Sequence, residues 1–147
     1  MKLESTVLIN KSPNVVWSYL SRVKNVAKRD RGVSRTRAIS TAEPGVGYEF
    51  ETFSNDKGEG RMAYRIIQAD PDCGCIIRLT SKTGNARFFK WAQWHFHLRN
   101  AAGGPLLTCS AEFVLRLPYL VLLPVFYFMK SAIHSDLLSL KKALENE

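Results

Sequence analysis

Two histidines, His95 and His97, lie two residues apart in a segment that alternates apolar and polar residues. Side chains two apart in a strand project from the same face, so these imidazoles would lie side by side, as two ligands of a metal ion can. A zinc site needs at least three protein ligands, and neither a third nearby residue nor the spacing of Cys73, Cys75 and Cys109 supplies them. We therefore expect surface histidines, no bound metal and no cofactor.

One lysine and two tyrosines are the candidates for proton chemistry. Strand periodicity places Lys90 on the same face as Phe88 and Ala92. A lysine facing an apolar cavity could pair with a ligand carboxylate or, with its pKa lowered by desolvation, act as a base; alternatively its ammonium reaches water at the strand end. Tyr48 and Tyr64 carry hydroxyls on faces that we expect to point inward. No convergent acid and base pair and no nucleophile motif is visible, so catalytic residues remain unassigned.

Seven strand-like segments would position these side chains. They cover residues 2–9, 33–40, 48–54, 61–69, 75–82, 86–99 and 106–116, with turn-forming residues between most of them. Ser12 and Pro13 predict the start of a short helix, and a second short helix follows through Val23 and Val26. Consecutive strands joined by tight turns indicate an antiparallel meander.

The inward faces of these strands are rich in aromatic residues and hold a few small or hydroxyl-bearing ones. Apolar walls with a few polar groups are typical of small-molecule pockets, whereas the alternative is a filled core with tyrosine hydroxyls at its rim. The sequence favours a cavity under the C-terminal helix. The residues expected to line it are Tyr48, Phe50, Tyr64, Phe88, Lys90, Trp94, Phe96, Phe113, Phe126, Met129 and Ile133.

The C-terminal stretch, residues 117–144, has two different halves. Its second half is an amphipathic helix, because apolar residues recur at helical spacing along one face: Leu122, Phe126, Met129, Ile133, Leu137, Leu140 and Leu144. Residues 119–129 contain no charge and are apolar all round. Such a segment must be buried on every side or face an apolar partner. It is shorter than the roughly 20 residues that cross a bilayer, and Pro118 and Pro124 interrupt it.

The formal net charge is +8, and part of it is concentrated in one block. Asp30 is the only acidic residue within that block, which consists of Arg22, Lys24, Lys28, Arg29, Arg31, Arg35 and Arg37. A basic block of this kind indicates an anionic partner, such as phosphate headgroups or nucleic acid, or else a solvated surface that favours solubility.

Length and cysteine content bound the class of protein. At 147 residues we expect a single domain, residues 1–147. Three cysteines, an odd number, argue against a disulfide framework and for a reducing compartment. Met1 leads directly into a strand pattern rather than a signal peptide, so we expect a cytoplasmic protein, with a peripheral membrane location as an alternative.

The order of these elements resembles the START-like (SRPBCC) superfamily, which takes in polyketide cyclases/dehydrases, lipid-transport proteins, coenzyme Q-binding proteins and the birch pollen allergen. The matching residues are Ile9, Ser12, Pro13, Val16 and Trp17; Gly45, Val46 and Gly47; Asp70 and Pro71; Gly103, Gly104 and Thr108; and residues 137–144. The resemblance spans the chain and implies an α+β helix-grip fold: a curved seven-stranded antiparallel sheet with two short helices and a long C-terminal helix over a hydrophobic cavity. Residues 28–31 depart from it, since many relatives carry an aromatic there, and imply a basic entrance.

Three functions remain open at this point. The first is binding or transport of a hydrophobic small molecule, for which the resemblance implies a lipid, an isoprenoid quinone or a polyketide-like aromatic. The second is a polyketide cyclase/dehydrase-type enzyme using Tyr48, Tyr64 and Lys90. The third is docking of the basic block to anionic membrane or ribosomal RNA, with nucleic acid the less favoured partner. We expect a monomer or a homodimer.

Overall fold

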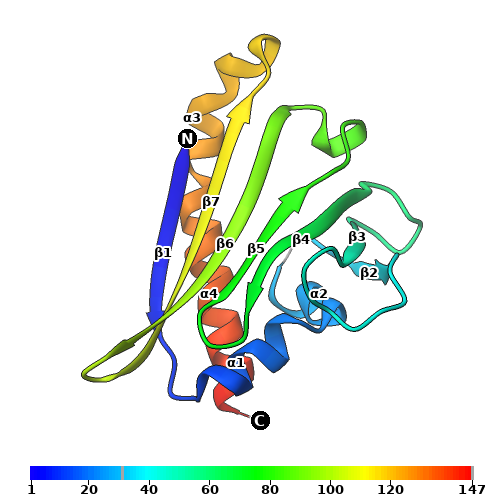
Figure 1. Ribbon diagram of the computed structural model, residues 1–147. Coiled ribbons are helices and arrows are strands. Elements are labelled where there is room, and N and C mark those ends of the chain that lie inside the picture. The colour runs from blue at the N-terminus through cyan, green and yellow to red at the C-terminus, as the bar shows by residue number, and fades with distance from the viewer. Residues whose placement is uncertain (31, 147) are drawn as a thin grey trace.

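A seven-stranded antiparallel sheet wraps around a long helix in the computed structural model, which describes residues 1–30 and 32–146 (Figure 1). The strands are β1 (Lys2–Leu8), β2 (Arg35–Ala38), β3 (Glu49–Phe53), β4 (Met62–Asp70), β5 (Gly74–Leu79), β6 (Phe89–Ala101) and β7 (Gly104–Leu115). Their order across the sheet is β1-β7-β6-β5-β4-β3-β2, so every sequential pair from β2 to β7 is a neighbour. The predicted meander and helix-grip fold are confirmed.

The helices lie on one side of this sheet. Between β1 and β2 come α1 (Pro13–Leu20), the 3₁₀ turn η1 (Val23–Asn25) and α2 (Val26–Arg29), and the short 3₁₀ turn η2 (Gly84–Ala86) precedes β6. After β7 the chain forms the 3₁₀ helix η3 (Leu117–Leu122), α3 (Leu123–Tyr127) and α4 (Met129–Glu145). Figure 1 shows α4 running along the inside of the curved sheet, with α1 and α2 near its C-terminal end.

Turns and bulges set the curvature of the sheet. At the β4–β5 turn Gly74 has φ +121°, and a Cβ built there would lie 1.8 Å from the Phe96 carbonyl oxygen, so only glycine allows this close pairing with β6. The pairing register shifts between Ile66 and Gln68 in β4, and again between Phe89 and Trp91 in β6. Such irregularities bend a strand and change which residues face inward.

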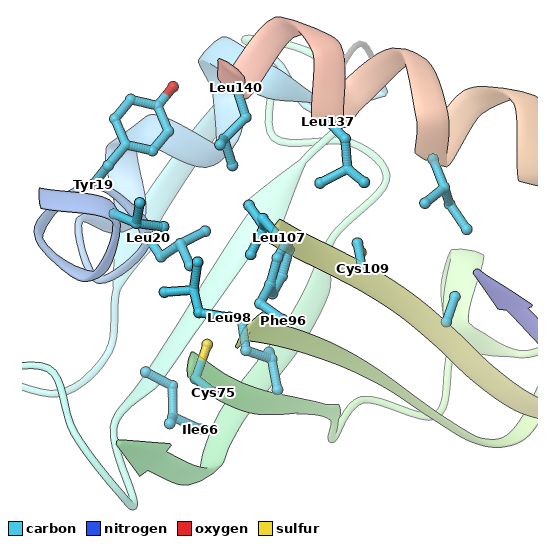
Figure 2. Close-up of a cluster of buried hydrophobic side chains, with 14 of the residues drawn as sticks. Tyr19, Leu20, Ile66, Cys75, Phe96, Leu98, Leu107, Cys109, Leu137 and Leu140 are labelled. Atoms are coloured by element: carbon cyan, nitrogen blue, oxygen red, sulfur yellow. The ribbon is translucent and has the colours of Figure 1, made fainter. Parts of the chain in front are cut away.

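The core is formed where α4 faces the strands. Ile133, Leu137, Leu140 and Leu144 follow helical spacing along one face of α4 and are buried. In Figure 2, Leu137 and Leu140 project from the helix toward the strands that carry Leu107 and Phe96. This is the amphipathic pattern that the sequence predicted for the second half of the C-terminal stretch.

Polar contacts fix α4 along β1 and the residues after it. The Ser5 hydroxyl and His134 Nδ1 are 2.6 Å apart, and Lys141 Nζ donates to the Leu8 carbonyl at 2.7 Å. The backbone N–H of Asn10 donates to Glu145 Oε1 at 3.1 Å, and this bond together with Lys141 lowers the pKa of Glu145. His134 therefore contacts β1.

The C-terminal stretch is not one continuous helix. The segment Leu117–Tyr127 meets Met129–Glu145 at 55°. Pro118 and Pro124 are the second residues of η3 and α3, within the first turn where the missing N–H needs no partner, and they favour separate short helices. Among the described residues no single helix is long and apolar enough to cross a membrane, and this bent pair meets the length and composition criteria only jointly.

Replacing Leu144 by alanine tests the packing of α4. Leu144 is fully buried and lies outside the cavity described below, so Leu144→Ala should lower the free energy of unfolding by about 2–5 kcal/mol. Leu138→Ala is the control because Leu138 is 47% exposed on the same helix, and it should change stability by less than about 0.5 kcal/mol. Urea denaturation measures both. Equal losses in the two variants would show that α4 does not pack as described.

Candidate functional site

A cavity of about 410 Å³ lies between the sheet and α4. This volume falls within the range of about 300–1,000 Å³ that is usual for small-molecule sites. Strands β3 to β7 supply Phe50, Thr52, Met62, Tyr64, Ile77, Phe89, Trp94, Phe96 and Cys109, and the C-terminal helices supply Phe126, Met129, Ala132, Ile133, Asp136, Leu137 and Leu140. The remaining lining residues come from α2 and the loops: Val26, Asp30, Gly32, Val33, Ser54, Gly60, Asn85 and Phe88.

Three aromatic rings form one wall of the cavity. The Phe50 and Tyr64 rings stack with centroids 5.3 Å apart, as their register in the β3–β4 pair allows. The Tyr64 ring meets Trp94 edge to face at 5.5 Å. A wall of this kind offers flat apolar surface and ring edges to a ligand.

The Tyr64 hydroxyl is a polar group in this wall. It lies 3.6 Å from Met62 Sδ. Burial raises the pKa of Tyr64 far above its ordinary value, the negative charge of Asp30 adds to the rise, and a side-chain hydrogen bond with Thr52 opposes it. The phenol is therefore neutral at physiological pH and can donate a hydrogen bond to a ligand oxygen.

A second aromatic cluster closes the end of the cavity near α3. Phe126 is its centre, with ring centroids 5.5 Å from Phe89, 5.5 Å from Phe113 and 6.2 Å from Phe88. Phe88 also meets Tyr119 at 4.9 Å. These rings fill the end near α3, and the cavity extends from this cluster toward α2.

Two carboxylates, Asp30 and Asp136, line the cavity, and the sequence analysis missed both as site residues. Asp136 follows Ile133 by three residues and Met129 by seven, and this helical spacing was the available signal. The sequence analysis identified Asp30 only as the single acidic residue within the basic block. Its Oδ1 accepts a hydrogen bond from the Gly32 N–H at 2.8 Å.

Most of the predicted cavity residues lie together in the structure. The predicted residues found in the lining are Phe50, Tyr64, Phe88, Trp94, Phe96, Phe126, Met129 and Ile133. Tyr48 and Phe113 are buried in the core but do not line the cavity. Phe113 packs behind the lining, against Phe89 and Phe126.

The inward placement of Lys90 was wrong. The register of β6 against β7 skips Lys90, because Phe89 pairs with Leu115 and Trp91 with Val114. This bulge turns Phe89 into the cavity and leaves Lys90 exposed. Among the described residues, no lysine or arginine lines the cavity.

The basic block is divided among different local environments. The Arg35 guanidinium lies 4.5 Å above the centroid of Phe53, and Arg37 forms an ion pair with Glu51. Glu51 is fully buried and also accepts a hydrogen bond from Arg61 Nε at 2.5 Å. These contacts tie β2, β3 and the start of β4 together on the face away from the cavity.

Among the other five cations of the block, Arg22, Lys24 and Lys28 are exposed. The side chain of Arg29 and the whole of Arg31 lie outside the described residues. Of the described residues between 22 and 37, those that line the cavity are Val26, Asp30, Gly32 and Val33. Because the prediction of a basic entrance falls partly on Arg29 and Arg31, which lie outside the described side chains, it stays a prediction. Docking of the block to anionic membrane or ribosomal RNA stays a prediction.

The two strand histidines lie on the outer face of β6. Their ring centroids are 5.6 Å apart, and partial burial together with the neighbouring His97 lowers the pKa of His95. Within the described part of the chain, no group of three or more histidine, cysteine, aspartate or glutamate side chains is placed to hold a metal ion.

Solved structures share this fold over nearly the whole chain. Protein MLL2253 from Mesorhizobium loti has a TM-score of 0.75 at 15% identity, covering 99% of this chain and 98% of that chain. Norcoclaurine synthase from Thalictrum flavum, in complex with dopamine and hydroxybenzaldehyde, has a TM-score of 0.74 at 11% identity and coverages of 100% and 87%. The di-domain ARO/CYC StfQ from the steffimycin biosynthetic pathway reaches 0.78 at 11% identity; the alignment covers 99% of this chain and half of that protein.

These similarities define the class of the fold. The chain has the helix-grip fold that these structures share, and the predicted resemblance is confirmed at the level of the fold. No protein-family model matches the sequence, and no curated protein matches it by sequence.

Replacing Tyr64 by phenylalanine tests the buried phenol. An unfolded tyrosine ionises near pH 10, whereas folded Tyr64 keeps its proton to higher pH, so wild-type stability should fall as pH rises through about 9–11. Tyr64→Phe should lose less stability over this interval. Urea denaturation at a series of pH values checks this, with Tyr127→Phe as the control at an exposed tyrosine. Parallel profiles for wild type and Tyr64→Phe would contradict the burial of the phenol.

Proposed function

We propose that the protein binds a hydrophobic small molecule in the cavity between the sheet and α4. The observation that carries this proposal is the cavity of about 410 Å³ with mostly apolar walls. Close-packed cores rarely leave voids larger than a water molecule, so a space of this size in a 147-residue chain suits a ligand better than a core.

The arrangement of the polar groups supports one kind of ligand. The Phe50, Tyr64 and Trp94 rings offer contacts to a flat ring system, and the neutral Tyr64 hydroxyl can donate to an oxygen on it. Leu137 and Leu140 offer aliphatic contacts to an apolar remainder. A planar head with an oxygen acceptor and an apolar body fits this layout, which favours an isoprenoid quinone or polyketide-like aromatic over a simple saturated lipid.

One solved relative supports an aromatic ligand. Norcoclaurine synthase, which shares the fold, was solved with dopamine and hydroxybenzaldehyde, both of which contain an aromatic ring. The proposal for the present chain rests on its own cavity, and the relative adds that this fold can hold such compounds.

A cyclase/dehydrase-type activity is the second candidate. The lining of one cavity includes Tyr64, Asp30 and Asp136, and carboxylate and phenol groups around a bound chain are what proton transfer requires. Two of the three residues first considered, Tyr48 and Lys90, do not line the cavity. Tyr64 therefore remains the candidate proton donor, with Asp30 and Asp136 in place of the lysine.

Filling the cavity should abolish ligand binding. Ile77 on β5 lines the cavity, so Ile77→Phe should weaken binding at least about tenfold by occupying space that the ligand needs. The probe is 1-anilinonaphthalene-8-sulfonate fluorescence, with displacement by decylubiquinone, an anthraquinone and palmitate. We expect the two ring compounds to displace the probe more strongly than palmitate does.

The matched control is Ile76→Phe. Ile76 is adjacent in β5 and absent from the cavity lining, so this variant should bind within about twofold of wild type. Circular dichroism verifies that both variants fold. Failure of every compound to bind wild type, or equal effects of the two substitutions, would refute the proposal.

A further inference from the structure

The segment from Leu117 to Phe128, which we name the apolar cap, leaves large hydrophobic side chains in solvent. Leu117 is 83% exposed, Val121 81% and Phe128 79%. The other exposed members are Leu120, Val125 and Tyr127. Scattered apolar residues are normal on a protein surface, but six on twelve consecutive residues form a patch that indicates an interaction site.

The outer faces of β6 and β7 extend this patch. Trp91 is 39% exposed and Val114 38%, and the two residues are register partners at the end of the sheet where the apolar cap begins. Figure 1 shows η3 and α3 at one end of the molecule, far from the C-terminus. Of the fourteen large hydrophobic residues that are exposed in the described part of the chain, eight therefore belong to the cap or to this register pair.

Cations surround the apolar cap. Arg116 immediately precedes it, and its Nε donates to the Phe89 carbonyl at 3.2 Å. Lys130 follows it two residues after Phe128 and is exposed. The Arg87 guanidinium lies 4.4 Å above the Phe88 ring, which in turn packs on Tyr119 of the cap.

Acidic residues are sparse in the sequence that forms this end, where Glu112 lies two residues before Val114. No aspartate or glutamate occurs between Asp72 and Glu112, or between Glu112 and Asp136. Lys82, Arg87 and Lys90 are exposed in the first of these intervals. An apolar, aromatic-containing surface with a cationic border complements an anionic bilayer, whose headgroups attract lysine and arginine while the interface accepts Tyr, Trp and aliphatic side chains.

We propose that the apolar cap docks onto the surface of an anionic lipid bilayer, with Val121, Val125 and Phe128 inserted and Arg87, Lys90 and Lys130 near the headgroups. The surface is distinct from the basic block of residues 22–37, which lies on η1, α2 and β2. Because η3 and α3 are short, the cap lies in the interface and does not span the bilayer.

Docking would bring the cavity next to lipid. Phe126 and Met129 line the cavity, while their neighbours Val125, Tyr127 and Phe128 point to solvent. The segment of residues 125–129 thus faces the cavity with some side chains and the proposed bilayer with others, which places a hydrophobic ligand close to lipid. This consequence rests on the proposed ligand binding, whereas the docking itself does not.

Vesicle sedimentation tests the docking. Wild type should bind vesicles of phosphatidylcholine with phosphatidylserine, bind phosphatidylcholine alone more weakly, and lose affinity as salt is raised. Val121→Asp with Phe128→Asp should weaken binding at least about tenfold, because two carboxylates would enter the apolar region. The control pair is Val46→Asp with Leu138→Asp, which adds the same charge at residues 69% and 47% exposed outside the cap, and it should retain more than half of the wild-type affinity.

Charge-reversal variants test which cations contribute to vesicle binding. Lys90→Glu with Lys130→Glu should lower binding to the anionic vesicles more than Arg22→Glu with Lys24→Glu, which makes the same change in the basic block. The reverse ranking would overturn the proposal and assign docking to the basic block. No vesicle binding by wild type would overturn it as well.

Sedimentation velocity distinguishes the bilayer from a second copy of this chain. A wild-type dimer that the Val121→Asp and Phe128→Asp pair converts to monomer, without vesicle binding, would make the cap a dimer interface and refute docking. Displacement of 1-anilinonaphthalene-8-sulfonate by decylubiquinone should stay within about twofold of wild type in this variant, since neither residue lines the cavity. Failure of ligand binding and failure of docking are therefore measured separately.

Discussion

The attachment of α4 to one edge of a curved sheet is the constraint on which the cavity depends. The contacts of α4 with the sheet are concentrated on β1, where Ser5 and Leu8 bond to His134 and Lys141, and Asn10 just after the strand bonds to Glu145. A straight helix held along one edge cannot also contact the strands that curve away from it. The space between α4 and β3 to β6 is filled only in part by side chains, and the remainder is the cavity.

A single extra residue in β6 decides the chemistry of that space. The bulge at Lys90 turns Phe89 inward and the ammonium outward, so the wall near α3 is aromatic where strict alternation would place a cation. The neutral Tyr64, the carboxylates Asp30 and Asp136 and the thiol of Cys109 are then the titratable groups lining the described cavity. This composition favours an uncharged ligand with an acceptor oxygen over an anionic one, because no lysine or arginine among the described residues lines the cavity to compensate a buried negative charge.

The sequence was sufficient to predict the orientation of side chains where periodicity alone determines it. Phe50, Trp94 and Phe96 follow a period of two, and Ile133 follows helical spacing, so their inward placement could be predicted without coordinates. The sequence did not predict the outward orientation of Lys90, because a bulge has no clear signal in the amino-acid composition. It also failed for Asp136, since an acidic residue on the border of an amphipathic helix can face solvent or a cavity, and only the position of the sheet decides. The burial of Glu51 depends on Arg37 and Arg61 from neighbouring strands, which is pairing that no local pattern encodes.

The all-round hydrophobicity of the residues between β7 and α4 has two separate causes. Phe126, Met129 and Tyr119 are apolar because they close the end of the cavity and its aromatic cluster. Leu117, Val121 and Phe128 are mostly exposed and do not line the cavity, so neither the core nor the cavity accounts for their hydrophobicity. Since the two prolines divide the segment into short helices, its outward residues are held at the end of the molecule and cannot fold back onto the sheet. An external apolar partner accounts for these side chains in a way that the internal packing does not.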